Sequence, residues 1–421
     1  MACFLLPKIH PAAGRHCGIF MRVRRKIMEN NYGYERKLKM NVKNEKYEQN
    51  QQNQQNQQNQ MNGHEEAWLE AYGFNTFFMK QWSALDQDIK TNGLIGRVIA
   101  DFGQKLRVAI NEGECLANRP VELKQMKGGI ATGDWVVVKP LNDGEEAIVL
   151  HVFQRFSKFS RAAAGVEVKE QIVATNIDTV FLAQSMNKDF NLRRMERYLV
   201  AAWDSGATPV ILLTKADLCE APEVYIEQMA SIAPGVEVIA LSSVSGMGLS
   251  QMTKYVTKGK TVAILGSSGV GKSTLVNALM GHDVLKTQSI REDDSKGRHT
   301  TTHRELVLLP GSGLILDTPG MRTLALWDAE NGEGMERIFG EIEGIIKECR
   351  FSNCTHKSEP GCAIRAALRS GRLEEKKWIN WQKLQKEIKF IESKANKKER
   401  ALHKQGAKSN TRKNISVYEV D

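Results

Sequence analysis

Gly266-Ser-Ser-Gly-Val-Gly-Lys-Ser273 is the stretch that decides the fold of this 421-residue chain. It fits the pattern G-x-x-x-x-G-K-[ST], and it stands between a strand-like run, Thr261–Leu265, and a helical run around Leu275. Glycines let backbone N–H groups close around phosphate oxygens, and the N-terminus of the following helix favours negative charge. The stretch predicts a phosphate-binding loop in which Lys272 reaches the β- and γ-phosphates and the Ser273 hydroxyl binds Mg²⁺.

Strand-like and helical runs alternate on both sides of this loop. Strands are predicted at Thr179–Ala183, Pro209–Leu213, Val236–Ala240, Thr261–Leu265, Glu305–Leu309 and Leu314–Leu316. After the first of them, Leu192, Met195 and Leu199 recur at helical spacing, with Asn191 as the expected N-cap. Buried strands with crossover helices predict a mostly parallel α/β sheet, which binds ligands at the carboxyl ends of its strands.

Two short motifs at strand ends indicate which base is bound. Thr214-Lys215-Ala-Asp217 follows the second predicted strand and is similar to the Asn-Lys-x-Asp guanine motif, with Thr in the first place. A carboxylate at Asp217 can accept from the ring N–H and the exocyclic amine of guanine, whereas adenine offers no such pair of donors and would leave the carboxylate unpaired. Ser242-Ser243 follows the third strand and is similar to the loop whose backbone N–H meets the guanine oxygen.

Two further segments are expected to respond to the γ-phosphate. Asp317-Thr-Pro-Gly320 ends the last predicted strand and fits D-x-x-G, so that Asp317 would hold Mg²⁺ through water and the Gly320 N–H would sense the phosphate. The polar stretch 297–302 lies where a switch loop belongs. A threonine hydroxyl there would join the ion when the triphosphate is bound, with Thr302 as first choice and Thr301 as second.

The order of these motifs is unusual. The base motifs precede the phosphate loop and the switch motifs follow it, whereas ordinary GTPases begin with the phosphate loop and end with the base motifs. A circular permutation preserves the site, because neighbours in a sheet need not be neighbours in the chain. The predicted nucleotide contacts are Thr214, Lys215, Asp217, Ser242, Ser243, Gly266, Ser267, Ser268, Gly269, Val270, Gly271, Lys272, Ser273, Thr274, Thr302, Asp317 and Gly320, of which Ser273, Thr302 and Asp317 would organise magnesium.

A metal site is predicted further along the chain. Three cysteines and a histidine fall within 14 residues, and together they make a complete tetrahedral ligand set: Cys349, Cys354, His356 and Cys362. Four protein ligands leave no open position, so we expect one structural zinc ion. The helix expected after it carries an apolar stripe that would pack on the zinc loop, formed by Trp378, Trp381, Leu384, Ile388 and Ile391. A basic end would then reach phosphate backbone through Lys394, Lys397, Lys398 and Arg400.

Residues 93–168 show a different pattern, of short alternating runs separated by glycine and asparagine. The runs are Leu94–Ile99, Leu106–Ile110, Trp135–Val138 and Ala147–Val152. Several short strands at this spacing predict a small barrel or a sandwich. A five-stranded oligonucleotide-binding (OB) barrel is one candidate.

The charge distribution favours a polyanionic partner. The net charge is +10, and residues 1–48 and 392–421 carry +7 and +4 of it, which leaves the body near neutral. Residues 49–60 are wholly Asn and Gln, a composition that cannot bury enough surface to offset chain entropy, so residues 1–65 are expected to be a disordered or over-extended tail. No run of 18 apolar residues exists, and seven scattered cysteines do not form a disulfide framework. We therefore expect a cytoplasmic monomer with no membrane contact.

At this point the chain resembles the ribosome small-subunit-dependent GTPase A family, the circularly permuted GTPases that assist maturation of the small ribosomal subunit. The resemblance spans about residues 90–395 and rests on 214–217, 266–273, 297–302, 317–320 and the four metal ligands. It implies an OB barrel before the GTPase core and a zinc domain after it. It also implies rRNA binding, and hydrolysis of GTP to GDP that the small subunit stimulates.

Two positions depart from expectation. Thr214 replaces the commoner Asn, which weakens the contact to the base but leaves Asp217 in place. Met321 stands where a Ras-like enzyme has its water-orienting Gln, and Met cannot orient water. By resemblance to the family's Gly-x-His-Thr-Thr-Thr segment, His299 becomes the catalytic candidate beside Lys272.

The sequence thus predicts a multidomain chain. Its expected parts are a tail (1–65), an OB-fold RNA-binding domain with a leading segment (66–170), a circularly permuted α/β P-loop GTPase domain (171–335), a mainly helical zinc-binding domain (336–400) and a basic tail (401–421). Two alternatives stay open. One is a P-loop ATPase or kinase with a zinc appendage, and the other is a non-enzymatic RNA-binding protein whose nucleotide site only switches shape.

Overall fold

The computed structural model describes residues 63–120, 128–141, 145–162, 170–280, 305–309, 311, 313–317, 332–391 and 393–394. The predictions for residues 1–62, His299, Thr301, Thr302, Gly320, Met321, Lys397, Lys398, Arg400 and the 401–421 tail fall outside these residues. Among the helices that are described, none has the length and apolarity needed to cross a membrane.

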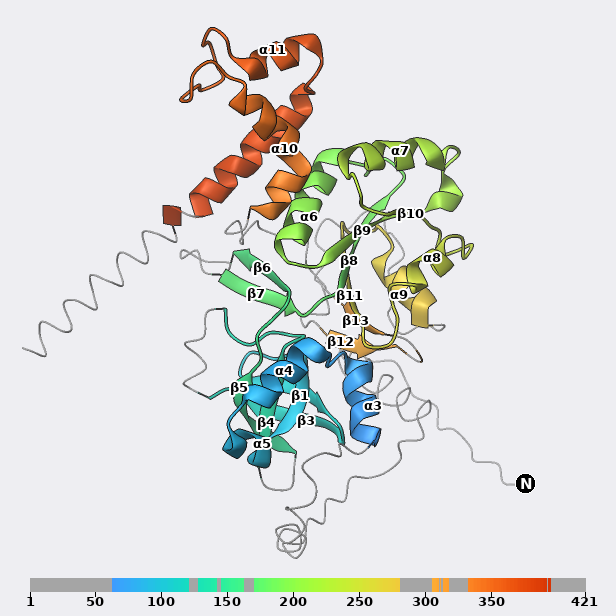
Figure 1. The fold of residues 1–421 in the computed structure, drawn as a ribbon. Coiled ribbons are helices and arrows are strands. Elements are labelled where there is room, and N and C mark those ends of the chain that lie inside the picture. The colour runs from blue at the N-terminus through green and yellow to red at the C-terminus, as the bar shows by residue number, and fades with distance from the viewer. Residues whose placement is uncertain are drawn as a thin grey trace, which may run out of the picture. The chain divides into compact units, whose positions relative to one another are not determined.

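A parallel sheet forms the central part of the fold (Figure 1). Its strands lie in the order β10-β9-β8-β11-β13-β12, and only β12 runs antiparallel to its neighbour. The strands are β8 (Thr179–Ser185), β9 (Thr208–Thr214), β10 (Val238–Ala240), β11 (Thr261–Gly266), β12 (Glu305–Leu308) and β13 (Leu314–Asp317). Every residue of β8 and β11 is buried, as expected of strands that are covered on both faces.

Helices cover both faces of this sheet. The helices are α6 (Leu192–Asp204), α7 (Pro222–Ile232), α8 (Leu249–Thr253) and α9 (Lys272–Met280). One core lies under α6 and α7, and a second lies under α8 and α9 (Figure 1). The predicted start of α6 is confirmed, because the Asn191 side chain accepts a hydrogen bond from the Arg194 N–H at 3.0 Å.

The N-terminal strands close into a five-stranded barrel. The strands are β1 (Leu94–Asp101), β2 (Lys105–Ile110), β3 (Gly113–Asn118), β4 (Trp135–Leu141) and β5 (Glu146–Val152). They pair in the closed order β1-β2-β3-β5-β4-β1, and only β3 and β5 are parallel. The closed circuit confirms the barrel and excludes the sandwich.

In the described part of the chain, three short helices precede the barrel and pack on it through aromatic side chains. They are α3 (Gly63–Tyr72), α4 (Thr76–Ala84) and α5 (Gln87–Asn92). The buried rings of Phe74 and Phe78 meet Trp135 of β4 and Phe153, with Phe74 edge-on to Trp135 at 4.9 Å between ring centroids. A hairpin of β6 (Lys158–Ala162) and β7 (Glu170–Thr175) then leads into the parallel sheet.

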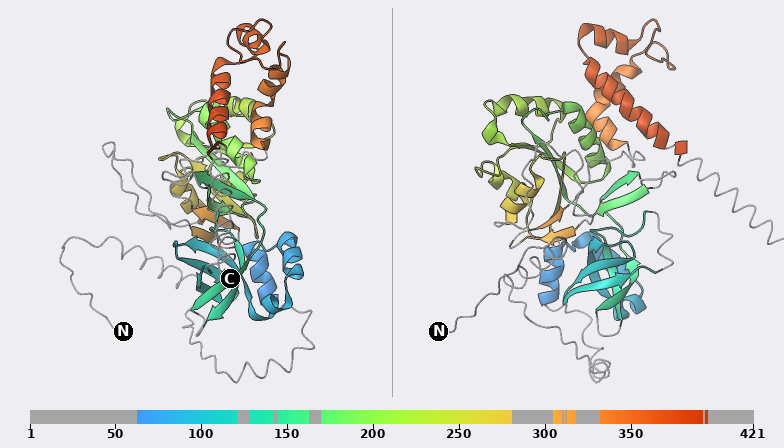
Figure 2. Two further views of the ribbon diagram at one scale, coloured as in Figure 1. Left: turned by 90° about the vertical axis from the view of Figure 1, so that its left-hand side faces the viewer. Right: turned by 180° about the vertical axis from the view of Figure 1, so that it is seen from behind.

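The C-terminal part is helical. It contains α10 (Glu333–Lys347), α11 (Ala363–Ser370) and a C-terminal helix at residues 375–391. Helix α10 packs directly on α6, where a Cβ on Gly334 would lie only 2.3 Å from the Val200 carbonyl oxygen. The C-terminal helix runs beside α10 in all the views (Figures 1 and 2), and Lys377 reaches Glu341 of α10 at 3.3 Å.

Candidate nucleotide site and metal centre

The predicted phosphate loop connects β11 to α9, and its conformation explains its glycines. A Cβ at Gly266 would meet the Ala183 carbonyl of the adjacent β8 at 2.4 Å, so only glycine fits there. Gly269 and Gly271 have φ values of +75° and +98°, which side chains rarely adopt. The Lys272 ammonium donates to the carbonyls of Gly266 (2.9 Å) and Ser267 (2.7 Å), and this places the cation across the mouth of the loop.

The base motif meets the phosphate loop directly. Thr214 ends β9, and its buried hydroxyl donates to the carbonyl of Val270 at 2.7 Å. The two motifs are 56 residues apart in the chain and lie at the same edge of the sheet. The Asp217 side chain is exposed beside this junction, available to a ligand. The hydroxyl of Thr214 therefore joins the two loops. This role was not predicted from the sequence.

The serine loop completes the base side of the site. The Ala216 N–H donates to the Leu241 carbonyl at 3.1 Å, so the serine loop begins beside the base motif. Ser242 is fully buried, and its hydroxyl accepts from the N–H groups of Val244 (3.2 Å) and Ser245 (3.1 Å). Its side chain holds the loop together, while Ser243 is less buried.

The D-x-x-G strand lies on the other side of the phosphate loop. β13 pairs with β11 in parallel, from Thr261 with Leu314 to Ala263 with Leu316, and the backbone of Asp317 follows at the same end of the sheet. The predicted magnesium ligands Ser273 and Asp317 thus come from neighbouring elements. Thr302, the third, lies outside the described residues.

One contact at the phosphate loop was not predicted. The Ser267 hydroxyl donates to the Asp189 carboxylate at 2.5 Å, and Asp189 lies in the loop between β8 and α6. No motif marks this residue. The available signal was its position just after a buried strand that, in a parallel sheet, neighbours the phosphate-loop strand.

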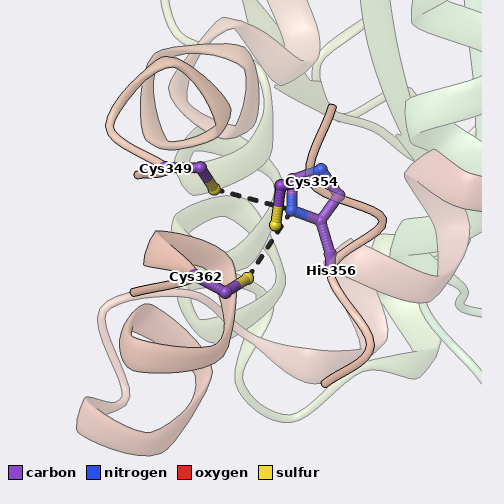
Figure 3. Close-up of side chains that lie close together, drawn as sticks. All are labelled: Cys349, Cys354, His356 and Cys362. Atoms are coloured by element: carbon purple, nitrogen blue, oxygen red, sulfur yellow. Dashed lines mark hydrogen bonds between the residues drawn. The ribbon is translucent and has the colours of Figure 1, made fainter. Parts of the chain in front are cut away.

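The four predicted metal ligands converge at one point (Figure 3). Their ligand atoms all lie within 4.8 Å of one another, and the His356 Nδ1 lies 3.6 Å from the sulfurs of both Cys349 and Cys362. Tetrahedral zinc, with bonds of about 2.3 Å to sulfur and about 2.05 Å to nitrogen, separates S and N by about 3.6 Å. The ligand set therefore fits zinc in both chemistry and spacing. Cys354 supplies the remaining thiol.

The metal loop is held by a carboxylate that sequence reasoning missed. Glu359 accepts hydrogen bonds from the backbone N–H groups of Thr355 (2.8 Å), Lys357 (3.0 Å) and Ser358 (3.1 Å). These bonds, with that from the Thr355 hydroxyl as the largest cause, hold the pKa of Glu359 well below its usual range. They brace the turn at His356, whose φ is +61°. Trp378 of the predicted stripe packs edge-on to the His356 ring, 5.6 Å between centroids.

Fold and site together define a class of protein. A phosphate loop in the middle of a parallel sheet, a guanine motif joined to it and a D-x-x-G strand beside it are the parts of a P-loop GTPase. Here the strands that carry the base motifs precede the phosphate loop in the chain. The protein is a circularly permuted GTPase with a barrel before the nucleotide domain and a candidate metal module after it.

Comparison with known proteins identifies the family. Residues 152–327 match the family described as RsgA GTPase. The small ribosomal subunit biogenesis GTPase RsgA 2 of Lactiplantibacillus plantarum is 43% identical over 314 residues, which cover 73% of this chain and 88% of that protein. RsgA 2 of Vibrio parahaemolyticus is 42% identical over 322 residues, 76% of this chain and 86% of that protein. The chain therefore belongs to the RsgA GTPase family, whose members hydrolyse GTP.

A solved structure agrees with this fold. The crystal structure of YjeQ from Thermotoga maritima superposes with a TM-score of 0.51 at 24% sequence identity. The match covers 70% of this chain and 98% of that one.

Proposed function

We propose that this chain binds the small ribosomal subunit, assists its late maturation and hydrolyses GTP to GDP under stimulation by that subunit. The relatives named above are small ribosomal subunit biogenesis GTPases, and they match this chain over most of their own length. The observation that carries the GTPase part is the bond from the Thr214 hydroxyl to the Val270 carbonyl, because it brings the guanine motif and the phosphate loop to one ligand. We place this activity in the cytoplasm.

The chemistry we propose is transfer of the γ-phosphoryl group to water. Lys272 neutralises the charge that develops on the phosphate oxygens, and the loop N–H groups bind the remainder. Ser273, Thr302 and Asp317 would hold Mg²⁺, and the bound ion would add positive charge that stabilises the same developing charge. His299 positions the attacking water, because Met321 occupies the place of the usual glutamine. We therefore expect GTP hydrolysis to be slow without the subunit. Binding of the subunit would place the catalytic groups of the switch region and so raise the rate.

The C-terminal helix offers a surface for rRNA. Lysines and two apolar side chains recur at helical spacing on its exposed face: Lys376, Ile379, Lys383, Lys386, Lys389 and Phe390. Phe390 is 55% exposed, and the Lys394 ammonium lies 4.7 Å from its ring centroid. Cations on phosphates with an aromatic ring beside them form a surface suited to RNA, where the ring can stack on an unpaired base.

The decisive experiment measures phosphate release from GTP with and without purified small subunits. We expect the subunit to raise the rate at least tenfold, and His299→Ala to abolish the stimulation. No stimulation, together with wild-type behaviour of His299→Ala, would favour a non-enzymatic RNA-binding switch. Displacement of labelled GTP decides the other alternative, because equal displacement by ATP and GTP would indicate a P-loop ATPase or kinase.

A charge-reversal experiment tests the RNA surface. Lys383→Glu with Lys386→Glu should weaken subunit binding at least tenfold and flatten its dependence on salt, because fewer counterions are released. Basal GTP hydrolysis should not change. Glu375→Lys with Glu336→Lys, on exposed positions of the C-terminal helix and α10, is the control and should not weaken binding. Unchanged binding by the lysine variant would place the rRNA contact on the barrel or the 401–421 tail instead.

A further inference from the structure

The loop between β8 and α6, residues 186–191, lies between the two halves of the nucleotide site. β8 is the direct neighbour of β11 on one side and of β9 on the other, so its carboxyl end lies between the ends of the strands that carry the phosphate loop and the base motif. The loop is bonded to both. The Met186 N–H donates to the Thr214 carbonyl at 3.1 Å, and the Asp189 carboxylate accepts from the Ser267 hydroxyl at 2.5 Å.

Residues of β8, of its following loop and of α6 hold Asp189 in place. The Arg194 guanidinium of α6 lies 2.9 Å from its second carboxylate oxygen. The Asp189 N–H donates to the Asn187 side-chain oxygen at 2.9 Å, and its carbonyl accepts from the buried Gln184 amide at 3.1 Å. With one oxygen on Ser267 and the other on Arg194, the carboxylate bridges the phosphate loop to the start of α6.

Charge does not explain why a carboxylate stands here. A bare carboxylate beside a phosphate site would repel the ligand, and Arg194 offsets that repulsion. The ion pair is also too exposed to add much to fold stability, since Asp189 and Arg194 keep 40% and 28% of their side-chain surface in solvent. We therefore attribute to the Asp189 carboxylate the role of orienting the phosphate loop. Ser267 is the second residue of the phosphate loop, and the bond to Asp189 fixes the loop at the point where the chain leaves β11.

We propose that Asp189 is a positioning residue of the phosphate loop, which through the Ser267 hydroxyl pre-orients the loop N–H groups and so sets the affinity for guanine nucleotides. The proposal rests on the nucleotide site described above and not on the ribosomal partner. It places a residue outside every nucleotide motif of this chain in control of nucleotide affinity. Both GDP and GTP should depend on it, because the start of the loop serves the phosphates that they share.

The test is a double-mutant cycle on the full-length chain without ribosomes. Dissociation constants of fluorescent GDP and of a non-hydrolysable GTP analogue are measured for Asp189→Ala, Ser267→Ala and the double variant. Loss of one hydrogen bond that preorganises a binding site corresponds to about a tenfold weaker affinity. We expect each single variant to bind both nucleotides about tenfold more weakly. The double variant should be no weaker than either single variant, because all three lack the same bond.

Two further variants separate positioning from charge and from general loss of structure. Asp189→Asn keeps an oxygen that accepts from Ser267, and it should bind within about threefold of the wild type. Tighter binding by Asp189→Asn would show that the carboxylate acts by repelling phosphate and would overturn the proposal. Glu333→Gln removes a more exposed ion pair, to Arg337 on α10, and should leave both affinities unchanged.

The remaining outcomes are also decisive. Wild-type affinity of both single variants would show that the bond does not position the loop. A double variant weaker by the product of the single effects, about a hundredfold, would show that the two side chains act independently. Thermal unfolding is followed for every variant. If Asp189→Ala unfolds, the comparison of Ser267→Ala with Asp189→Asn still tests the proposal. Neither of these substitutions leaves a large cavity next to the phosphate loop.

Discussion

Thr214 shows how one hydroxyl can join the two loops of the candidate nucleotide site. Its side chain is 4% exposed, and its hydroxyl donates to the Val270 carbonyl of the phosphate loop. We expect the contact to guanine to come from Asp217, whose side chain is exposed. Threonine in the first place of the motif therefore does not remove the junction between the base and phosphate loops.

Removing that hydroxyl should loosen both halves of the site. Thr214→Val keeps the shape of the side chain but leaves the Val270 carbonyl without its donor, at a cost of about 1–3 kcal/mol. We expect nucleotide affinity to fall about tenfold for GDP and GTP alike, measured by fluorescence titration. Thr214→Asn should restore affinity, because its amide N–H can reach the same carbonyl. If Thr214→Val binds normally, the junction is maintained by other contacts, among them that of Met186.

At the scale of elements, α6 and the C-terminal helix share a buried carboxylate. Glu196 of α6 has no exposed surface, pairs with Arg193, and accepts from the Asn380 amide at 2.6 Å. Burial raises the pKa of Glu196, against the opposing effects of Arg193 and Asn380. The folded state thus binds this proton more tightly than the unfolded state does, and the stabilisation that protonation gives is lost as pH rises through the raised pKa.

Glu196→Gln should therefore change the pH dependence of stability. Glutamine resembles the protonated acid, so the variant should match the wild type near pH 4.5 and unfold at a higher temperature near pH 8. Calorimetry across this range measures the difference. Glu341→Gln, at an exposed position on α10 next to Lys377, is the control and should show no such gain. A variant that is less stable at pH 8 would mean that the pair with Arg193 outweighs the cost of burying the charge.

Metal removal tests the C-terminal module as an element. A metal ion held by Cys349, Cys354, His356 and Cys362 would fix the loop that carries them, so the free energy of metal binding would add to the free energy of folding there. Cys362→Ser or a strong chelator should release zinc from one ion per chain to less than about a tenth, and alter the fluorescence of Trp378 beside His356. Cys219→Ser changes a thiol outside the set and should keep the metal. Full metal content in Cys362→Ser would contradict the assignment.

Elements with a strong local signal could be predicted from the sequence, and those that depend on distant partners could not. β8, β9 and β11 read as continuous apolar runs because both of their faces are buried. β3 escaped prediction because its buried positions hold only the small residues Cys115 and Ala117, while the larger Leu116 faces outward. The metal ligands were all predicted because they lie within 14 residues. Asp189 was missed because its partner is 78 residues away.

At the scale of the whole molecule, one buried arginine joins three segments. Arg97 of β1 is 1% exposed and donates to the carbonyls of Tyr72 at the end of α3, Gly133 before β4 (3.4 Å) and Asn176 before β8 (3.0 Å). Its guanidinium also lies 5.4 Å from the ring centroid of Trp135. Desolvation lowers the pKa of Arg97 to about 10, so the side chain remains charged at neutral pH.

Replacing Arg97 should make the unfolding of the barrel less cooperative with that of the parallel sheet. Arg97→Met fills most of the volume but removes one donor from each of these three carbonyls, although that of Gly133 still accepts from the Asn176 amide at 3.0 Å. We expect this loss to destabilise the fold by about 3–5 kcal/mol. Since the segments it joins belong to the helical N-terminus, the barrel and the start of the parallel sheet, their unfolding should also become less cooperative. Calorimetry should resolve two transitions where the wild type shows one. Nucleotide should raise the temperature of only one of them, because only the parallel sheet carries the site.

Two controls make this last prediction specific. Arg97→Lys keeps the charge but not the planar fork that reaches three acceptors, so it should recover only part of the lost stability. Arg369→Met, at an exposed position near the end of α11, should leave a single transition. One cooperative transition in Arg97→Met, shifted to lower temperature, would mean that the pairing of β1 with β12, at Ala100 and Glu305, is enough to couple the barrel to the nucleotide domain. Arg97 would then stabilise the barrel without making its unfolding cooperative with that of the nucleotide domain.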